Sequence, residues 1–166
     1  MKLDDASEDE FIAAMTPLFE GAPRFLRRLA AARPFGSADE LFERASDIAL
    51  TMPEDEQLEL VDAHPRLGAA PGSVSAMSYV EQGYDRGQDT TSPLRAELAR
   101  LNEAYEERFG FRYCVFVAGR SREELLPDMR AALNADRGTE LRRGLRAVVD
   151  IARDRFAAHA REATAR

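Results

Sequence analysis

The chain has two histidines, and histidine is the side chain whose charge changes most readily near neutral pH. His64 precedes Pro65, whose ring biases the preceding residue toward an extended backbone, so its imidazole should sit where a helix ends. His159 lies in the polar stretch AAHAREATAR near the C-terminus, where a solvated side chain is expected. His64 is therefore the candidate general acid or base, although a histidine beside a proline is often purely structural.

A second group of polar side chains lies in the sequence SYVEQG, which contains Ser78, Glu81 and Gln82. Ser78 and Glu81 have the spacing of a capping box that starts a helix. Gln82 and Gly83 interrupt the segment almost at once, and a single helical turn would place a hydroxyl, a carboxylate and an amide on one side. The residues alone leave both interpretations open.

The elements that must position these side chains are predicted to be helices. Apolar residues recur mainly at intervals of three and four, the spacing of helices that bury one face. Ser or Thr stands three residues before Glu at four expected helix starts: Ser7 and Glu10, Ser37 and Glu40, Thr51 and Glu54, Ser121 and Glu124. Ser92 with Pro93 indicates another start, and Gly110 the end of that helix.

Three segments depart from the helical pattern. Residues 64–76 combine two Pro, two Gly and two Ser, and residues 83–92, GYDRGQDTTS, form a second interruption, with a short helical segment, Met77 to Gln82, between them. The run FRYCVFVA at 111–118 resembles a strand but has no partner strand, so we expect a buried helical or extended segment. The prediction is an all-α, single-domain helical bundle of about seven to nine helices over residues 1–166, with residues 159–166 as a flexible tail.

Composition narrows the classes of function. The 166 residues are 45% hydrophobic, enough for one domain with a core. The formal charge of -7 repels phosphate backbones, so no nucleic-acid partner is expected. The acidic N-terminus and the lack of a long apolar run predict a cytoplasmic protein without a membrane contact. The single cysteine, Cys114, lies among apolar neighbours and should be a buried, unreactive thiol.

Four motifs occur together in a specific order: HPRLG at 64–68, SYVEQG at 78–83, LNEAYEERFGFRYCVFVAGRSREELL at 101–126 and RAVVDIARDRF at 146–156. Together they resemble the family of 2-oxo-4-hydroxy-4-carboxy-5-ureidoimidazoline (OHCU) decarboxylases. The resemblance covers about residues 7–158. It implies a cofactor-free decarboxylase of urate breakdown that forms (S)-allantoin, with an all-α fold and a homodimeric assembly.

The resemblance also assigns roles to individual residues. It implies that His64 and Glu81 are catalytic, without a metal. It implies contacts to a small anionic ureidoimidazoline substrate at these positions: Pro65, Ser78, Gln82, Phe109, Gly110, Phe111, Arg112, Tyr113 and Arg155. Within the segment 109–113 it is the backbone that should hold the substrate ring.

These residue types suit a decarboxylation. Glu81 beside His64 would orient the imidazole and raise its pKa, because a nearby negative charge favours the protonated form. Arg155 would supply a planar fork for substrate oxygens. Arg143, Arg146 and Arg153 are neighbouring alternatives to Arg155. The chain departs from the family pattern at Arg66, Arg112 and Asp150, which puts the geometry of the substrate loop in question more than the catalytic identity.

Other functions fit the same residues. A non-enzymatic helical interaction module would use the His-Pro and Ser-x-x-Glu elements as turns and caps, and would leave His64, Glu81 and Arg155 far apart. A related cofactor-free ring-processing enzyme, such as a hydrolase of a ring amide, would share the site but incorporate water. A metal hydrolase lacks a convincing set of ligands, and no serine lies in a nucleophile elbow.

Overall fold

The computed structural model describes residues 3–84 and 92–165, and within these ranges it contains helices and no strand. The predicted all-α class is confirmed, and the number of α-helices falls within the expected range. Their bounds are α1 Glu8–Phe19, α2 Pro23–Ala31, α3 Ala38–Thr51, α4 Glu54–Asp62, α5 Ala76–Glu81, α6 Ser92–Phe109, α7 Arg122–Ala132 and α8 Arg137–Thr164. Two short 3₁₀ turns span Leu3–Asp5 and Pro71–Ser73.

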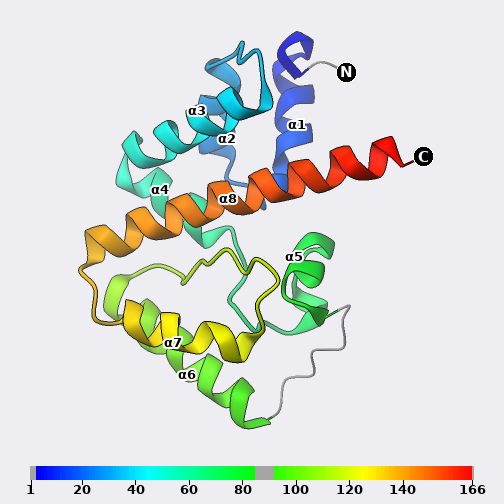
Figure 1. The fold of residues 1–166 in the computed structure, drawn as a ribbon. Coiled ribbons are helices and arrows are strands. Elements are labelled where there is room, and N and C mark those ends of the chain that lie inside the picture. The colour runs from blue at the N-terminus through cyan, green and yellow to red at the C-terminus, as the bar shows by residue number, and fades with distance from the viewer. Residues whose placement is uncertain (1–2, 85–91, 166) are drawn as a thin grey trace.

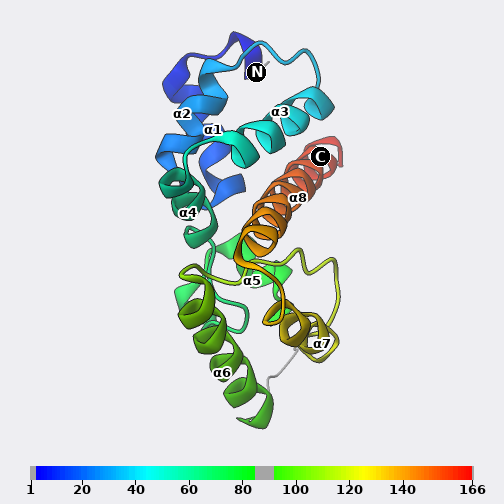
Figure 2. The same cartoon turned by 90° about the vertical axis from the view of Figure 1, so that its left-hand side faces the viewer.

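The long helix α8 crosses the middle of the molecule (Figure 1). Helices α1 to α4 pack on one side of it, where α1, α3 and α4 all contact α8 directly. Helices α6 and α7 pair with each other on the other side, and the molecule is elongated in the direction that joins the two groups (Figure 2). Because α5 also lies on the side away from α1, a residue on α8 can reach both groups.

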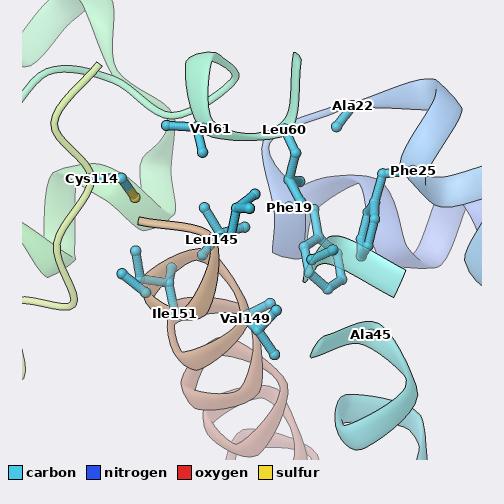
Figure 3. Packing of buried hydrophobic residues seen from close by; sticks show 14 of the residues in the cluster. Phe19, Ala22, Phe25, Ala45, Leu60, Val61, Cys114, Leu145, Val149 and Ile151 are labelled. Carbon is cyan, nitrogen blue, oxygen red and sulfur yellow. The ribbon is translucent and has the colours of Figure 1, made fainter. Parts of the chain in front are cut away.

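The buried apolar residues of α8 point in several directions (Figure 3). Leu145 faces Leu60 and Val61 of α4, whereas Ile151 lies on the side of Cys114. All five of these side chains are buried. Burying apolar surface on several sides explains why so polar a sequence forms a helix of 28 residues.

The predicted helix starts are confirmed in part. Ser7 and Ser121 form complete capping boxes with Glu10 and Glu124, and the Ser37 hydroxyl accepts a hydrogen bond from the Glu40 amide. The start predicted at Thr51 was wrong. Thr51 ends α3, and its hydroxyl donates to the carbonyl oxygen of Asp47 at 2.7 Å, while Pro53 precedes the first residue of α4.

The irregular segments also match their predictions where they are described. The segment 111–118 forms neither helix nor strand and ends in a turn at Ala118, and α6 ends at Phe109 with Gly110 in the left-handed region at φ 79°. The short helix between the two interruptions is α5. Most of the second interruption, residues 85–91, lies outside the described residues. Helix α8 continues through residues 159–164, where His159 is exposed as expected.

Candidate active site

A cavity of about 460 Å³ lies between α5, the loop after α4, the extended segment 113–119 and α8. It is lined by a subset of the predicted site residues: His64, Pro65, Ser78, Glu81, Gln82 and Tyr113. Phe109, Gly110, Phe111, Arg112 and Arg155 are not among its lining residues. Ile151 and Asp154 of α8 complete the wall.

His64 is the most unusual polar group of this cavity. Its side chain is 3% exposed, and neither ring nitrogen has a hydrogen-bond partner among the described residues. Burial and, to a smaller extent, the positive charge of Arg155 lower the pKa of His64 to about 4, and the opposing effects of Glu20 and of the Leu60 backbone do not offset them. At neutral pH the imidazole is therefore uncharged and can accept a proton from a ligand.

Glu81 does not pair with His64, contrary to the prediction. Its two carboxylate oxygens accept hydrogen bonds from Nε and Nη2 of Arg155, at 2.5 Å and 2.7 Å. A guanidinium fork fits a carboxylate in this two-point manner better than an imidazole does. The expected rise in the pKa of His64 is consequently wrong in direction, because no carboxylate pairs with the ring.

Arg155 is enclosed by acceptors from two parts of the chain, the end of α1 and helix α5. Besides Glu81, its guanidinium donates to the Pro17 carbonyl oxygen at 2.8 Å, to Glu20 at 2.8 Å and to the Ser78 hydroxyl at 3.1 Å. Its side chain is 2% exposed. Arg155, rather than its neighbours on α8, is thus the arginine that reaches Ser78 and Glu81, but its N–H groups point at protein acceptors and not into the cavity.

Glu20 is a site residue that the sequence analysis missed. One of its oxygens accepts hydrogen bonds from Ser75 at 2.7 Å, Ser78 at 2.6 Å and Arg155 at 2.8 Å. Burial raises the pKa of Glu20, but the hydrogen bonds from Ser78 and Ser75, with the charge of Arg155, bring it below the ordinary value. The only local sign of Glu20 in the sequence is its place before Gly21 at the end of a helix.

Burial raises the pKa of Glu81, and Arg155 opposes this rise only in part. The nearby negative charges of Glu20 and Asp154 act in the same direction as burial. Glu81 is 25% exposed in its side chain, so it is the more accessible of the two carboxylates that bind Arg155. It can therefore take up a proton more easily than Glu20.

Ser78 does not begin a helix, so the capping-box alternative for SYVEQG is excluded. The N-cap of α5 is Ser75, whose hydroxyl accepts a hydrogen bond from the Ser78 amide at 3.1 Å. Gln82 uses its side chain on the HPRLG loop: its oxygen accepts from the Gly68 amide at 2.8 Å, and its nitrogen donates to the Arg66 carbonyl oxygen at 3.3 Å. Gln82 thereby fixes the loop that carries His64.

The segment 109–113 stabilises the backbone that carries His64. Arg112 donates to the carbonyl oxygens of Asp62 at 3.0 Å and His64 at 3.1 Å, so it holds the backbone at the histidine. Phe109 and Phe111 pack around the ring of Tyr105. Cys114 is buried as expected, and burial raises the pKa of its thiol to about 12.

No helix in the described part of the chain is long and apolar enough to span a membrane. No group of three or more His, Cys, Asp or Glu side chains in it has the arrangement of a metal site.

The lowered pKa of His64 predicts how stability responds to acid. Because the unfolded chain binds a proton near the ordinary pKa of 6.5 and the folded chain only near 4, the unfolded state gains protons first as the pH falls. The stability contributed by neutral His64 is complete above pH 6.5 and is lost toward pH 4. Between pH 7 and pH 5 we expect a loss of about 2 kcal/mol, which His64→Asn should not show. Urea denaturation of both proteins at the two pH values measures this, and equal losses would contradict it.

Known proteins were compared with the chain and its structure. The model of the OHCU decarboxylase family matches residues 4–157. The 2-oxo-4-hydroxy-4-carboxy-5-ureidoimidazoline decarboxylase of Haloferax volcanii is 31% identical over 156 residues, which cover 94% of this chain and 90% of that protein. A uric acid degradation bifunctional protein of Bacillus sp. strain TB-90 is 28% identical over 151 residues, and the chain spans only 30% of its length.

The fold has a counterpart among solved structures. A crystal structure of OHCU decarboxylase in the presence of (S)-allantoin aligns with a TM-score of 0.71 and 21% identity, covering 92% of this chain and 97% of that one. At this identity the likeness confirms the fold. The family model, which spans nearly the whole chain, and the relative from Haloferax volcanii together confirm the resemblance found in the four motifs. The chain belongs to the OHCU decarboxylase family.

Proposed function

We propose that this enzyme decarboxylates OHCU to (S)-allantoin in urate degradation, and that the cavity beside His64 holds the reacting ring. The observation that carries the proposal is an imidazole that is 3% exposed, lines a cavity and, within the described part of the chain, has no hydrogen-bond partner for either nitrogen. Buried polar groups are normally paired, so an unpaired one facing a cavity indicates a ligand.

The reaction needs proton transfer and an electron acceptor. The bond between the ring carbon and the carboxylate breaks, CO₂ leaves, and the electron pair enters the neighbouring C=N bond of the imidazoline ring. The hydroxyl on the same carbon then loses its proton as a carbonyl forms, a proton is added to the adjacent carbon that bears the ureido group, and the ring nitrogen that received the electron pair takes up a second proton. The balance is one OHCU anion and one proton giving allantoin and CO₂.

The residues divide this work as follows. Neutral His64 accepts the hydroxyl proton and returns it to one face of the adjacent carbon, which fixes the chirality of the product. Glu81, which also lines the cavity and whose pKa is raised, delivers the second proton to the ring nitrogen. Arg155 acts through Glu81 and Ser78, because its donors already bind them, and direct binding of a substrate anion by Arg155 would require Glu81 to release it.

The arrangement also bears on the alternatives. An interaction module would leave His64, Glu81 and Arg155 apart, yet Glu81 binds Arg155 and shares a cavity wall with His64. A hydrolase would use the same base but would incorporate water and release no CO₂. A homodimeric state and a cytoplasmic location stay predictions of the family resemblance and the composition.

The experiment that tests the proposal generates OHCU from urate in situ and follows the circular dichroism of allantoin with and without the protein. We expect faster formation of the (S) enantiomer together with release of CO₂. Racemic product at the spontaneous rate would contradict the proposal. Incorporation of ¹⁸O from labelled water into a ring-opened product would favour the hydrolase instead.

A further inference from the structure

We propose that Glu20 is a positioning residue of this active site, which sets the orientation of Arg155 and Ser78 without lining the cavity itself. This inference rests on the proposed function. Glu20 caps the C-terminal end of α1, and most of that helix lies across α8 from α5 (Figure 1). Its carboxylate meets Ser78 and Arg155 where the three elements converge.

The backbone at Glu20 is unusual for its residue type. Glu20 caps α1 with φ 59°, in the left-handed region where helix ends normally carry Gly. Gly21 and Ala22 follow at φ 120° and φ 57°, so three consecutive residues have positive φ. A non-glycine residue in this region costs on the order of 1 kcal/mol. The chain thus keeps a carboxylate at a place where the backbone favours glycine.

The side chain of Glu20 accounts for this placement. It supplies one oxygen to Arg155 and to both serines of α5, and it is 12% exposed. The same end of α1 adds the Pro17 and Leu18 carbonyl oxygens to Nη1 of Arg155, at 2.8 Å and 3.3 Å. The end of α1 therefore holds one edge of the guanidinium while Glu81 holds the other.

The contact with Glu20 also determines whether the Ser78 hydroxyl can donate a hydrogen bond to a ligand or accept one from it. An ionised carboxylate only accepts hydrogen bonds, so the Ser78 hydroxyl must donate its proton to Glu20. A guanidinium only donates, so the same oxygen accepts from Arg155. Ser78 consequently presents a lone pair, and no proton, to a ligand in the cavity.

The negative charge of Glu20 also affects the pKa values of the site residues. The charged groups that act on His64 and Glu81 are Glu20 from α1 and Arg155 from α8, with Asp154 of α8 also acting on Glu81. The negative charge of Glu20 raises the pKa of both His64 and Glu81. Removing this charge should lower both pKa values, whereas a residue that only fastens α1 to α5 would leave them unchanged.

The test uses Glu20→Gln, with Glu20→Gly as a second variant that relieves the left-handed backbone while it deletes the carboxylate. We expect kcat to fall about 10- to 100-fold, with KM within about threefold. The acid limb of the pH–rate profile should move to lower pH. Glu20→Asp should recover part of kcat. The matched control is Glu59→Gln, which removes a partly buried carboxylate of α4, 25% exposed in its side chain, from an ion pair with Arg24 of α2.

An independent measurement is the NMR titration of the His64 ring, which does not depend on turnover. In Glu20→Gln the ring should titrate at lower pH than in the unsubstituted protein, and in Glu59→Gln at the same pH. Unchanged kcat and ring titration in folded Glu20→Gln would overturn the inference, as would a loss of kcat that only follows a loss of folded protein. If the unsubstituted enzyme forms no allantoin, the proposed function fails, and the ring titration still decides the role of Glu20.

Discussion

Replacing His64 by asparagine should lower the rate of allantoin formation about 10²- to 10⁴-fold, the usual contribution of a general acid or base. Asparagine keeps a polar side chain of similar size but cannot accept and return a proton near neutral pH. The effect should be large because His64 is the only histidine that lines the cavity, and it is neutral at pH 7. The measurement is the initial rate at saturating, freshly generated OHCU.

The matched control for this variant is His159→Asn. His159 is exposed on the last turns of α8, so its replacement should leave the rate unchanged. Near-normal, stereospecific turnover by folded His64→Asn would remove His64 from the chemistry. In that case Glu81 and Asp154 would be the remaining carboxylates that line the cavity, of which Glu81 has the raised pKa.

Replacing Arg155 by methionine should lower the free energy of unfolding by about 3–5 kcal/mol at pH 7, the cost of breaking a buried ion pair from one side. Methionine fills much of the same space but leaves Glu20 and Glu81 without their cation and leaves the acceptors at the end of α1 unpaired. The loss should shrink at pH 5, because a protonated Glu81 needs no cation and its pKa is already raised. Urea denaturation at both pH values measures the effect.

Three further variants define the source of this loss. Arg146→Met on the exposed face of α8 should change stability by less than about 0.5 kcal/mol. Arg155→Lys, which keeps the charge but not the fork, should lie between the two. Adding Glu20→Gln and Glu81→Gln to Arg155→Met should restore part of the stability, because the unpaired charges are gone. Full stability of Arg155→Met alone would show that the buried network contributes nothing to folding.

Local sequence patterns predicted most of the fold. Apolar spacing found the helices because buried residues recur at intervals of three and four along each of them, and Ser7 and Ser121 could be recognised because a capping box is complete within four residues. The failure at Thr51 has a local cause. A threonine inside a helix can donate to the carbonyl oxygen four residues earlier, and Pro53 then fixes where α4 begins.

The site was only partly predictable. His64, Ser78, Glu81 and Gln82 were found because distinctive motifs carry them and because α5 follows His64 closely in the chain. The partner of Glu81 was not predicted, because Arg155 lies 74 residues away along the chain. Whether Glu81 pairs with the imidazole of His64 or with the guanidinium of Arg155 depends on burial in the folded protein, which no local pattern shows. Glu20 lies 135 residues from Arg155 along the chain and is not part of the apolar spacing that predicts the helices. No local pattern could therefore connect the two residues.

The position of Arg155 on the helix that joins both halves of the molecule has a consequence for how this protein can diverge. A substitution that alters the guanidinium removes hydrogen bonds that join α8 to both α1 and α5, and under the proposed function it also affects turnover. Evolutionary change at this residue is therefore constrained twice, and new specificities should arise sooner at cavity residues outside the network, such as Val115 to Ala118.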